Sequence, residues 1–179
     1  IISGAEFNIN QKIECNSHNF MKRMRGISWK IIGTHSWFLD IPETDIKDVF
    51  DIFIKSAEEI KASGFCHIER ELTRFKNHNE ENVKELMFAL VDYAVRNNIY
   101  LEINESSILQ GNNNLERMKI WIPYANEKKA NFYMGSDAHF CKRVGKFDNI
   151  LEIINDVGIP KERILNHICN YDLLEKINP

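Results

Sequence analysis

The sequence predicts an α/β fold in which parallel strands alternate with helices, and three observations support this prediction. Short apolar runs alternate with longer segments whose apolar residues recur every three or four positions. Histidine, aspartate and glutamate recur where the apolar runs end. The length of 179 residues and the hydrophobic content of 44% suit one domain, residues 1–179, with a substantial core.

The first half of the chain carries three strand candidates and one helix. Residues 1–9 form an apolar run, and residues 29–36 form a second run that ends in polar residues. A helix is predicted over about 43–63, because its apolar side chains recur at helical spacing, and Ser63-Gly64 ends it. Residues 65–68 are a third, very short strand candidate.

The second half repeats the alternation. An amphipathic helix is predicted over about 80–97, and it leads into a strand over 99–104. Gly158 stops the last long helix, and Pro160 opens a short helical turn. The remaining segments are, in order, a helix at about 114–129, a strand at 130–136, a helix at about 147–157 and a short helix at 170–176. Five such βα units make either a doubly wound sheet or part of a barrel.

Composition argues against several classes of partner. Lys plus Arg is 23 and Asp plus Glu is 26, so the net charge of −3 does not indicate a nucleic-acid-binding protein. No apolar run reaches the roughly 18 residues expected of a membrane helix. The four cysteines form no CxxC pair, which is typical of reduced thiols in a cytoplasmic protein. No pattern indicates an oligomeric state.

Potential metal ligands gather at the strand ends. Because ligands bind at the carboxyl ends of parallel strands, we expect these side chains to share one patch. Imidazole and carboxylate bind Zn, Mn and Fe, and paired cations commonly serve phosphoester hydrolysis. A single strand-end histidine is more often a polar loop residue, and Asp137 could cap the next helix. The strand-end residues are Glu6, His35, His67, Glu102, Asn104, Asp137 and His139.

Five short motifs carry a family resemblance. In chain order they are GAE at 4–6, IGTH at 32–35, CHI at 66–68, LEIN at 101–104 and GSDAH at 135–139. Val144-Gly145 and Phe147 fit a downstream V-G-x-F loop. Each motif is weak alone, but in this order they resemble the polymerase and histidinol phosphatase (PHP) superfamily, and they span most of the chain.

The resemblance implies a distorted (β/α)7 barrel with up to three divalent metals, either Zn, Mn or Fe. By position, Glu6 bridges the first and second metals, while His35 and His67 complete the second. Asp137 binds the first metal and His139 binds the third. The 101–104 motif belongs mainly to the barrel wall.

The resemblance also implies sequence upstream of Ile1. The family's first strand carries H-x-H and its second a further histidine, and neither motif is in this chain. We therefore expect about 60–90 upstream residues, equal to two βα units, so that this chain supplies the last five. A degenerate relative that lacks these strands is the alternative.

The activity that the resemblance implies is hydrolysis of a small phosphomonoester. Asp137 and His139 are the catalytic candidates, and the general acid stays open. Arg70 and Arg143 are the preferred phosphate-binding candidates, and Arg74 is a third. The stretch IGTHSWF at 32–38 most resembles the histidinol-phosphatase branch, which makes histidinol phosphate the leading substrate.

Two other functions compete with this one. A truncated or degenerate PHP module would have a structural or regulatory role without catalysis. An unrelated α/β domain would carry these strand-end histidines by coincidence.

Overall fold

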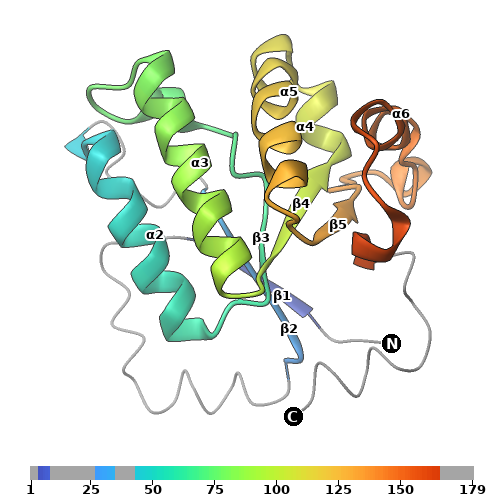
Figure 1. Cartoon of the computed structure of the whole chain (residues 1–179), viewed down its shortest axis with the longest axis horizontal. Helices are drawn as coiled ribbons and strands as arrows, with labels where there is room; N and C mark the ends of the chain where they lie inside the picture. The colour runs from blue at the N-terminus through green and yellow to red at the C-terminus, as the bar shows by residue number, and fades with distance from the viewer. Residues whose placement is uncertain (1–3, 9–26, 35–42, 166–179) are drawn as a thin grey trace.

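A five-stranded parallel sheet forms the centre of the molecule. The computed structural model describes residues 4–8, 27–34 and 43–165 (Figure 1). The strands lie side by side in chain order, so the described sheet has no reversal of the kind found in doubly wound folds. They are β1 (Gly4–Asn8), β2 (Trp29–Gly33), β3 (Gly64–Phe65), β4 (Tyr100–Asn104) and β5 (Phe132–Gly135). The predicted α/β class with parallel strands is confirmed.

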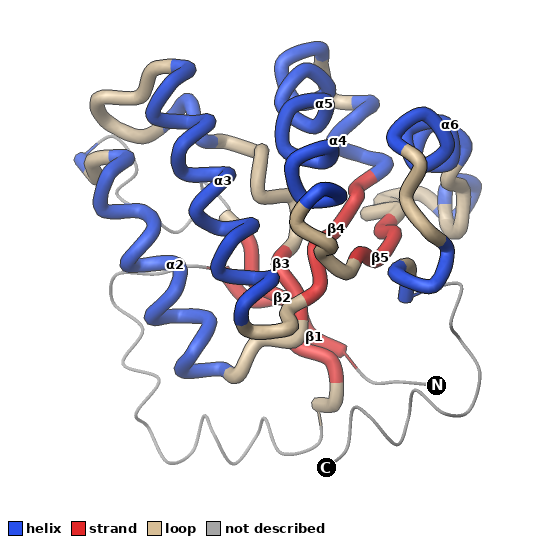
Figure 2. The backbone as a smooth tube through the Cα atoms, in the orientation of Figure 1, coloured by secondary structure: helices blue, strands red, loops and turns tan. Residues whose placement is uncertain are grey.

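Helices follow β2, β3, β4 and β5 in the chain and cover one face of the sheet. Figure 2 shows α2, α3 and α5 side by side along this face, with α6 beyond β5. Three single turns of 3-10 helix complete the description: η2 (Leu72–Arg74), η3 (Cys141–Arg143) and η4 (Lys161–Arg163). The α-helices are α2 (Ile46–Ile60), α3 (Glu80–Arg96), α4 (Glu105–Leu109), α5 (Asn112–Glu127) and α6 (Asp148–Val157). Within the described ranges, no helix is both long and apolar enough to cross a bilayer.

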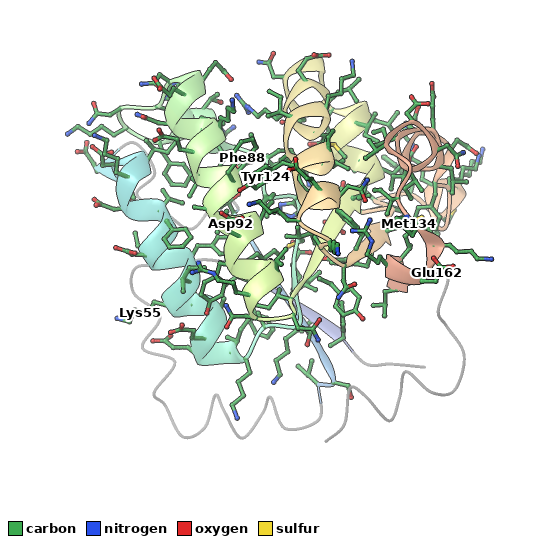
Figure 3. The ribbon with its side chains drawn as sticks, viewed as in Figure 1. Lys55, Phe88, Asp92, Tyr124, Met134 and Glu162 are labelled. Carbon is green, nitrogen blue, oxygen red and sulfur yellow. The ribbon has the colours of Figure 1, made fainter. Side chains whose placement is uncertain are left out.

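The α3–α5 contact shows how the helix layer is held together. The rings of Phe88 and Tyr124 stack with centroids 3.9 Å apart (Figure 3). The Tyr124 hydroxyl donates a hydrogen bond of 2.9 Å to Asp92, so the contact combines apolar stacking with a polar anchor.

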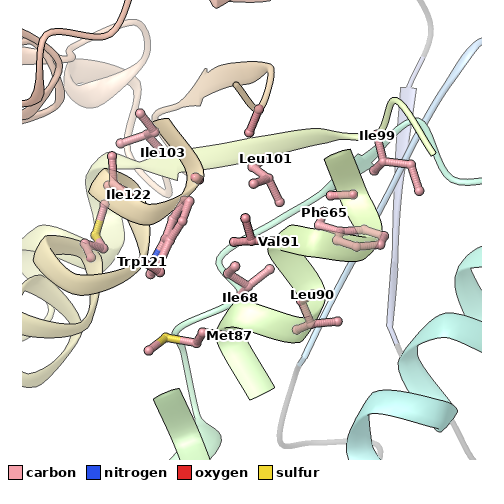
Figure 4. Close-up of a cluster of buried hydrophobic side chains, with 14 of the residues drawn as sticks. Phe65, Ile68, Met87, Leu90, Val91, Ile99, Leu101, Ile103, Trp121 and Ile122 are labelled. Carbon is pink, nitrogen blue, oxygen red and sulfur yellow. The ribbon is translucent and has the colours of Figure 1, made fainter. Parts of the chain in front are cut away.

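The two faces of the sheet differ in chemistry because side chains alternate along each strand. Facing the helices are apolar residues such as Phe65, Leu101 and Ile103, which join Val91 and Trp121 in the core (Figure 4). The opposite face carries both aromatic and polar side chains. Trp29 makes edge contacts with Tyr100 and Tyr133 on this face. Its polar side chains include Glu6, Cys66 and Glu102.

The structure departs from the predicted elements in two places. Helix α2 ends at Lys61, which adopts a left-handed conformation with φ of 54°, and Gly64 already belongs to β3 rather than ending the helix. Helix α4 was not predicted, because five residues are too few to show a periodic pattern. It begins where the Asn104 side chain accepts a hydrogen bond of 2.8 Å from the Ser107 backbone. The short helix predicted at 170–176 lies outside the described residues.

Candidate metal centre

The side chains of His67 and Cys66 face the same side of the sheet, although adjacent residues of a strand normally face opposite sides. The Cys66 backbone N–H still pairs with Ile32 at 2.9 Å, as in the parallel sheet. His67 then takes a left-handed conformation with φ of 33°, which is uncommon for a residue other than glycine. This turn brings the imidazole to the side of the strand on which Cys66 already lies, facing Glu6 of β1.

Glu6, Cys66 and His67 form a cluster whose geometry fits a metal ion. The Glu6 Oε1 atom lies 3.0 Å from His67 Nε2 and 3.5 Å from Cys66 Sγ. The three potential donor atoms all lie within 4.8 Å of one another. Ligands that share one Zn²⁺ at about 2.0–2.3 Å are separated by roughly 3–4 Å, so small adjustments suffice. In the part of the chain that the structure describes, no other three His, Cys, Asp or Glu donors come this close.

Gly33 provides the space for this cluster. A Cβ atom at Gly33 would lie 2.6 Å from Cys66 Sγ and 2.6 Å from His67 Cε1. Any side chain here would therefore push both donors aside. The motif at 32–35 drew attention to His35, which lies outside the described residues, whereas the structure shows what its glycine does.

The side chain of Glu102 is hydrogen-bonded to the backbone of His67. Its Oε2 atom accepts a hydrogen bond of 3.1 Å from the His67 N–H and one of 3.0 Å from Asn104 Nδ2. The carboxylate crosses over Gly135, where a Cβ atom would lie 1.8 Å from Glu102 Oε1. The prediction placed Glu102 and Asn104 in the barrel wall. The structure adds that Glu102 contacts a candidate ligand directly.

The cluster lies in a negatively charged environment, in which Cys66 and His67 are buried and Glu6 is exposed. Burial raises the pKa of Glu102 to about 7, and the charges of Glu69 and Glu6 add to this effect against the lowering influence of His67 and Asn104. Burial, followed by the charges of Glu102 and Glu6, holds the pKa of the Cys66 thiol well above its ordinary value. Burial alone would lower the pKa of His67, but its hydrogen bond to Glu6 and the charge of Glu102 raise it overall. A cation would relieve this excess of negative charge.

Asp137 and His139 are arranged differently. Arg70 Nη1 lies 2.7 Å from Asp137 Oδ2, and Arg70 Nη2 donates to Gln110 Oε1 at 2.5 Å. His139 Nε2 lies 3.6 Å from Asp137 Oδ1, and its side chain is 76% exposed. These two predicted ligands therefore lie together, but as described they are not part of the three-donor cluster around Glu6. Their assignment as ligands stays a prediction.

The predicted phosphate-binding arginines occupy three different settings. Arg70 is turned inward and pairs with Asp137, as described above. Arg143 is exposed and lines a pocket of about 420 Å³ together with Asp137, His139 and Lys146. The Arg74 side chain is 59% exposed and lies 4.0 Å from Glu71, and its role stays a prediction.

Sequence reasoning gave no role to Cys66 or to the two supporting glycines. Cys66 stands directly before a predicted ligand, and that proximity was the available signal. Strand alternation argued against a ligand role for Cys66, because adjacent residues of a strand normally face opposite sides. The left-handed conformation of His67 is what lets both side chains face the same side.

Comparisons with known proteins point to phosphatases. No family model matches the chain. It is 37% identical over 82 residues to a probable phosphatase of Vibrio vulnificus, and 30% identical over 78 residues to one of Clostridium botulinum. Each match covers 44% of this chain and 32% of the relative. A probable phosphatase of Clostridium novyi is 28% identical over 141 residues, which cover 72% of this chain and 57% of the relative.

The chain thus spans between about a third and somewhat more than half of the length of these relatives. Their names give the reaction class in general terms and specify neither a substrate nor a metal. The similarity is therefore to parts of proteins that are named as probable phosphatases.

Proposed function

We propose that the chain is the metal-binding part of a metal-dependent phosphomonoesterase of the PHP superfamily. The observation that carries the proposal is the 3.0 Å contact between Glu6 of β1 and His67, which follows β3. The order of the five motifs and the similarity to probable phosphatases support it. The unreversed strand order is compatible with a segment of a distorted (β/α)7 barrel.

A divalent cation held by Glu6 and His67 would polarise the phosphoryl group and supply a water nucleophile at neutral pH. The chain's own residues then bind and orient the ester. Glu102 keeps His67 in its left-handed conformation through the backbone N–H. Arg143 presents a forked donor to the phosphate oxygens from the wall of the pocket beside Asp137.

The proposed substrate is a small phosphomonoester. The pocket of about 420 Å³ beside Asp137 and His139 is in the size range of small-molecule sites. Histidinol phosphate is the first ester to assay, because the 32–38 stretch resembles the histidinol-phosphatase branch. Up to three cations, either Zn, Mn or Fe, are proposed for the complete centre, with His35, Asp137 and His139 as further ligands. A cytoplasmic location is part of the proposal.

A second candidate function is a PHP module without catalysis. The pairing of Arg70 with Asp137 at 2.7 Å favours it, because a guanidinium already balances the carboxylate that would otherwise bind a metal. Such a module would keep a cation at the Glu6 cluster for structural reasons alone.

Phosphate release and metal content, measured on the same samples, test both functions. The full chain is treated with chelator and reloaded with Zn²⁺, Mn²⁺ or Fe²⁺, and release of phosphate from histidinol phosphate and from a simple aryl phosphate is followed. Glu6→Gln should lose both cation and activity, while Glu127→Gln, an exposed change at the end of α5, should retain both. Bound cation without hydrolysis of any ester would favour the non-catalytic module.

A further inference from the structure

We propose that Cys66 is a sulfur ligand of the cation held by Glu6 and His67, and that this thiolate makes the centre select Zn²⁺ over Mn²⁺. The inference rests on the proposed function for the presence of a cation at this cluster. It adds a donor that neither the motif pattern nor the similarity to phosphatases assigns.

The position of the sulfur atom is the first argument. Cys66 Sγ lies 3.5 Å from Glu6 Oε1, within the range expected for two ligands of one tetrahedral Zn²⁺. His67 Nε2 lies 3.0 Å from the same oxygen, so one carboxylate oxygen faces both donors. The thiol is set by the backbone, since the Cys66 N–H is tied to Ile32 at 2.9 Å.

The direction of the side chain is the second argument. A buried free cysteine commonly serves as a small apolar packing residue. Strand alternation turns Cys66 to the face opposite its core neighbour Phe65. A Cβ atom at Gly33 would lie 2.6 Å from Cys66 Sγ and 2.6 Å from His67 Cε1, so any side chain there would displace the sulfur and the imidazole together. The thiol thus faces the Glu6 carboxylate and not the apolar core.

The charge around the sulfur is the third argument. Cys66 is 1% exposed, and its thiol donates a hydrogen bond of 3.5 Å to the Glu6 carboxylate. A second carboxylate, that of Glu102, accepts a hydrogen bond from the backbone N–H of the adjacent His67. Two carboxylates this close to the sulfur favour a bound cation at this place.

Donor softness gives the functional consequence. Thiolate sulfur favours Zn²⁺, whereas Mn²⁺ prefers carboxylate, carbonyl and water ligands. A Glu–His pair alone accepts either metal. A third donor of sulfur therefore biases the centre toward Zn²⁺.

Cobalt substitution tests the proposal directly. The full chain is loaded with Co²⁺, and its near-ultraviolet absorption is recorded alongside the cobalt content. We expect a thiolate-to-cobalt charge-transfer band that Cys66→Ser and Cys66→Ala both remove. Cys141→Ser, at an exposed cysteine of η3, should leave the band intact. In competition experiments, Cys66→Ser should lower the preference for Zn²⁺ over Mn²⁺ by about tenfold or more.

The possible outcomes separate this inference from the proposed function. Cobalt bound by the wild-type chain without a charge-transfer band, or with a band that survives in both Cys66 variants, overturns the role of Cys66 and leaves the centre standing. If the wild-type chain binds no more cobalt than Glu6→Gln, the centre itself is wrong, and the role of Cys66 is lost with it. Circular dichroism of each variant distinguishes loss of a ligand from loss of the fold.

Discussion

The Glu6–Cys66–His67 cluster and the Asp137–His139 strand end carry similar side chains but are built in different ways. The cluster combines Glu6 of β1 with two residues that follow β3, and the His67 side chain is 3% exposed. Asp137 and His139 come from one loop, and the His139 side chain is 76% exposed. The comparison shows two ways of positioning potential metal ligands. Strand pairing can position the ligands before a metal binds, whereas in an exposed loop their positions depend on contacts between side chains.

Both regions share one backbone feature. His67 and Asp137 each adopt a positive φ, of 33° and 45°, as the second residue after the end of a strand. Such conformations cost free energy in residues other than glycine and concentrate at functional sites. At His67 the conformation is held by the buried Glu102 carboxylate. At Asp137 the partner is the guanidinium of Arg70, which also donates a hydrogen bond to Gln110.

The largest expected effect is a difference in cation affinity between variants of His67 and His139, the histidines of the two regions. His67→Ala should weaken binding of a cation at the cluster by more than about 100-fold, because it removes a ligand rather than an outer contact. His139→Ala should change that same affinity by less than about threefold, since its imidazole is outside the cluster. Isothermal titration with Zn²⁺ measures both. Equal losses in the two variants would mean that a single centre includes both regions.

The second prediction concerns stability against pH in the metal-free chain. Burial raises the pKa of Glu102 from 4.5 to about 7, so the folded state binds this proton more tightly than the unfolded state. Stability should therefore be lost as pH rises from about 4.5 to about 7, by on the order of 3 kcal/mol. His67, with a raised pKa, adds a loss of the same sign at higher pH.

Urea unfolding in the presence of chelator, at about pH 5 and about pH 8, measures this loss. Glu102→Gln mimics the protonated carboxyl and should remove most of the difference between the two pH values. Glu127→Gln, at an exposed position, should keep it. A pH dependence that is the same in all three proteins would show that Glu102 is not its source.

The third prediction compares the arginines. Arg143→Ala should raise KM for a phosphate ester about tenfold, equal to about 1.4 kcal/mol, without lowering stability, because this residue is exposed. Arg70→Ala should raise KM as well. In addition, it should lower the free energy of unfolding by about 1–3 kcal/mol, because Asp137 and Gln110 lose their hydrogen-bond partner. Arg74→Ala should leave KM unchanged. Steady-state kinetics and urea unfolding of the three variants measure these effects. An increase in KM for Arg74→Ala as large as that for Arg143→Ala would contradict the proposal that Arg143 binds the phosphate.

The smallest expected effect concerns the wall of the pocket. Glu105 of α4 accepts hydrogen bonds from the backbone N–H groups of Asn149 and Ile150, at 3.3 Å and 3.1 Å. It thus caps α6, whose own N-cap residue Phe147 provides no side-chain hydrogen bond. Glu105→Ala should cost about 1 kcal/mol of unfolding free energy. Cation affinity at the cluster should stay the same, and a loss there would show that the two regions are coupled.

Much of the fold was predictable because periodicity and turn residues act locally. The strand over 99–104 and the helix over 80–97 match β4 (Tyr100–Asn104) and α3 (Glu80–Arg96) closely. Helix α4 and the end of α2 were not predicted. A five-residue helix has no period to detect, and the left-handed end at Lys61 has no glycine to signal it.

The sequence by itself determined the alternation of strands and helices, and it predicted that Glu6, His67 and Asp137 gather at one edge, because parallel strands end together. Only the tertiary structure decided which of these side chains meet. The turn at His67 adds Cys66 to the cluster, and the missing side chain of Gly33 leaves room for it. Arg70 engages Asp137 instead of standing free for phosphate. Such outcomes depend on backbone angles and close approaches between distant segments, which no local pattern of residue types encodes.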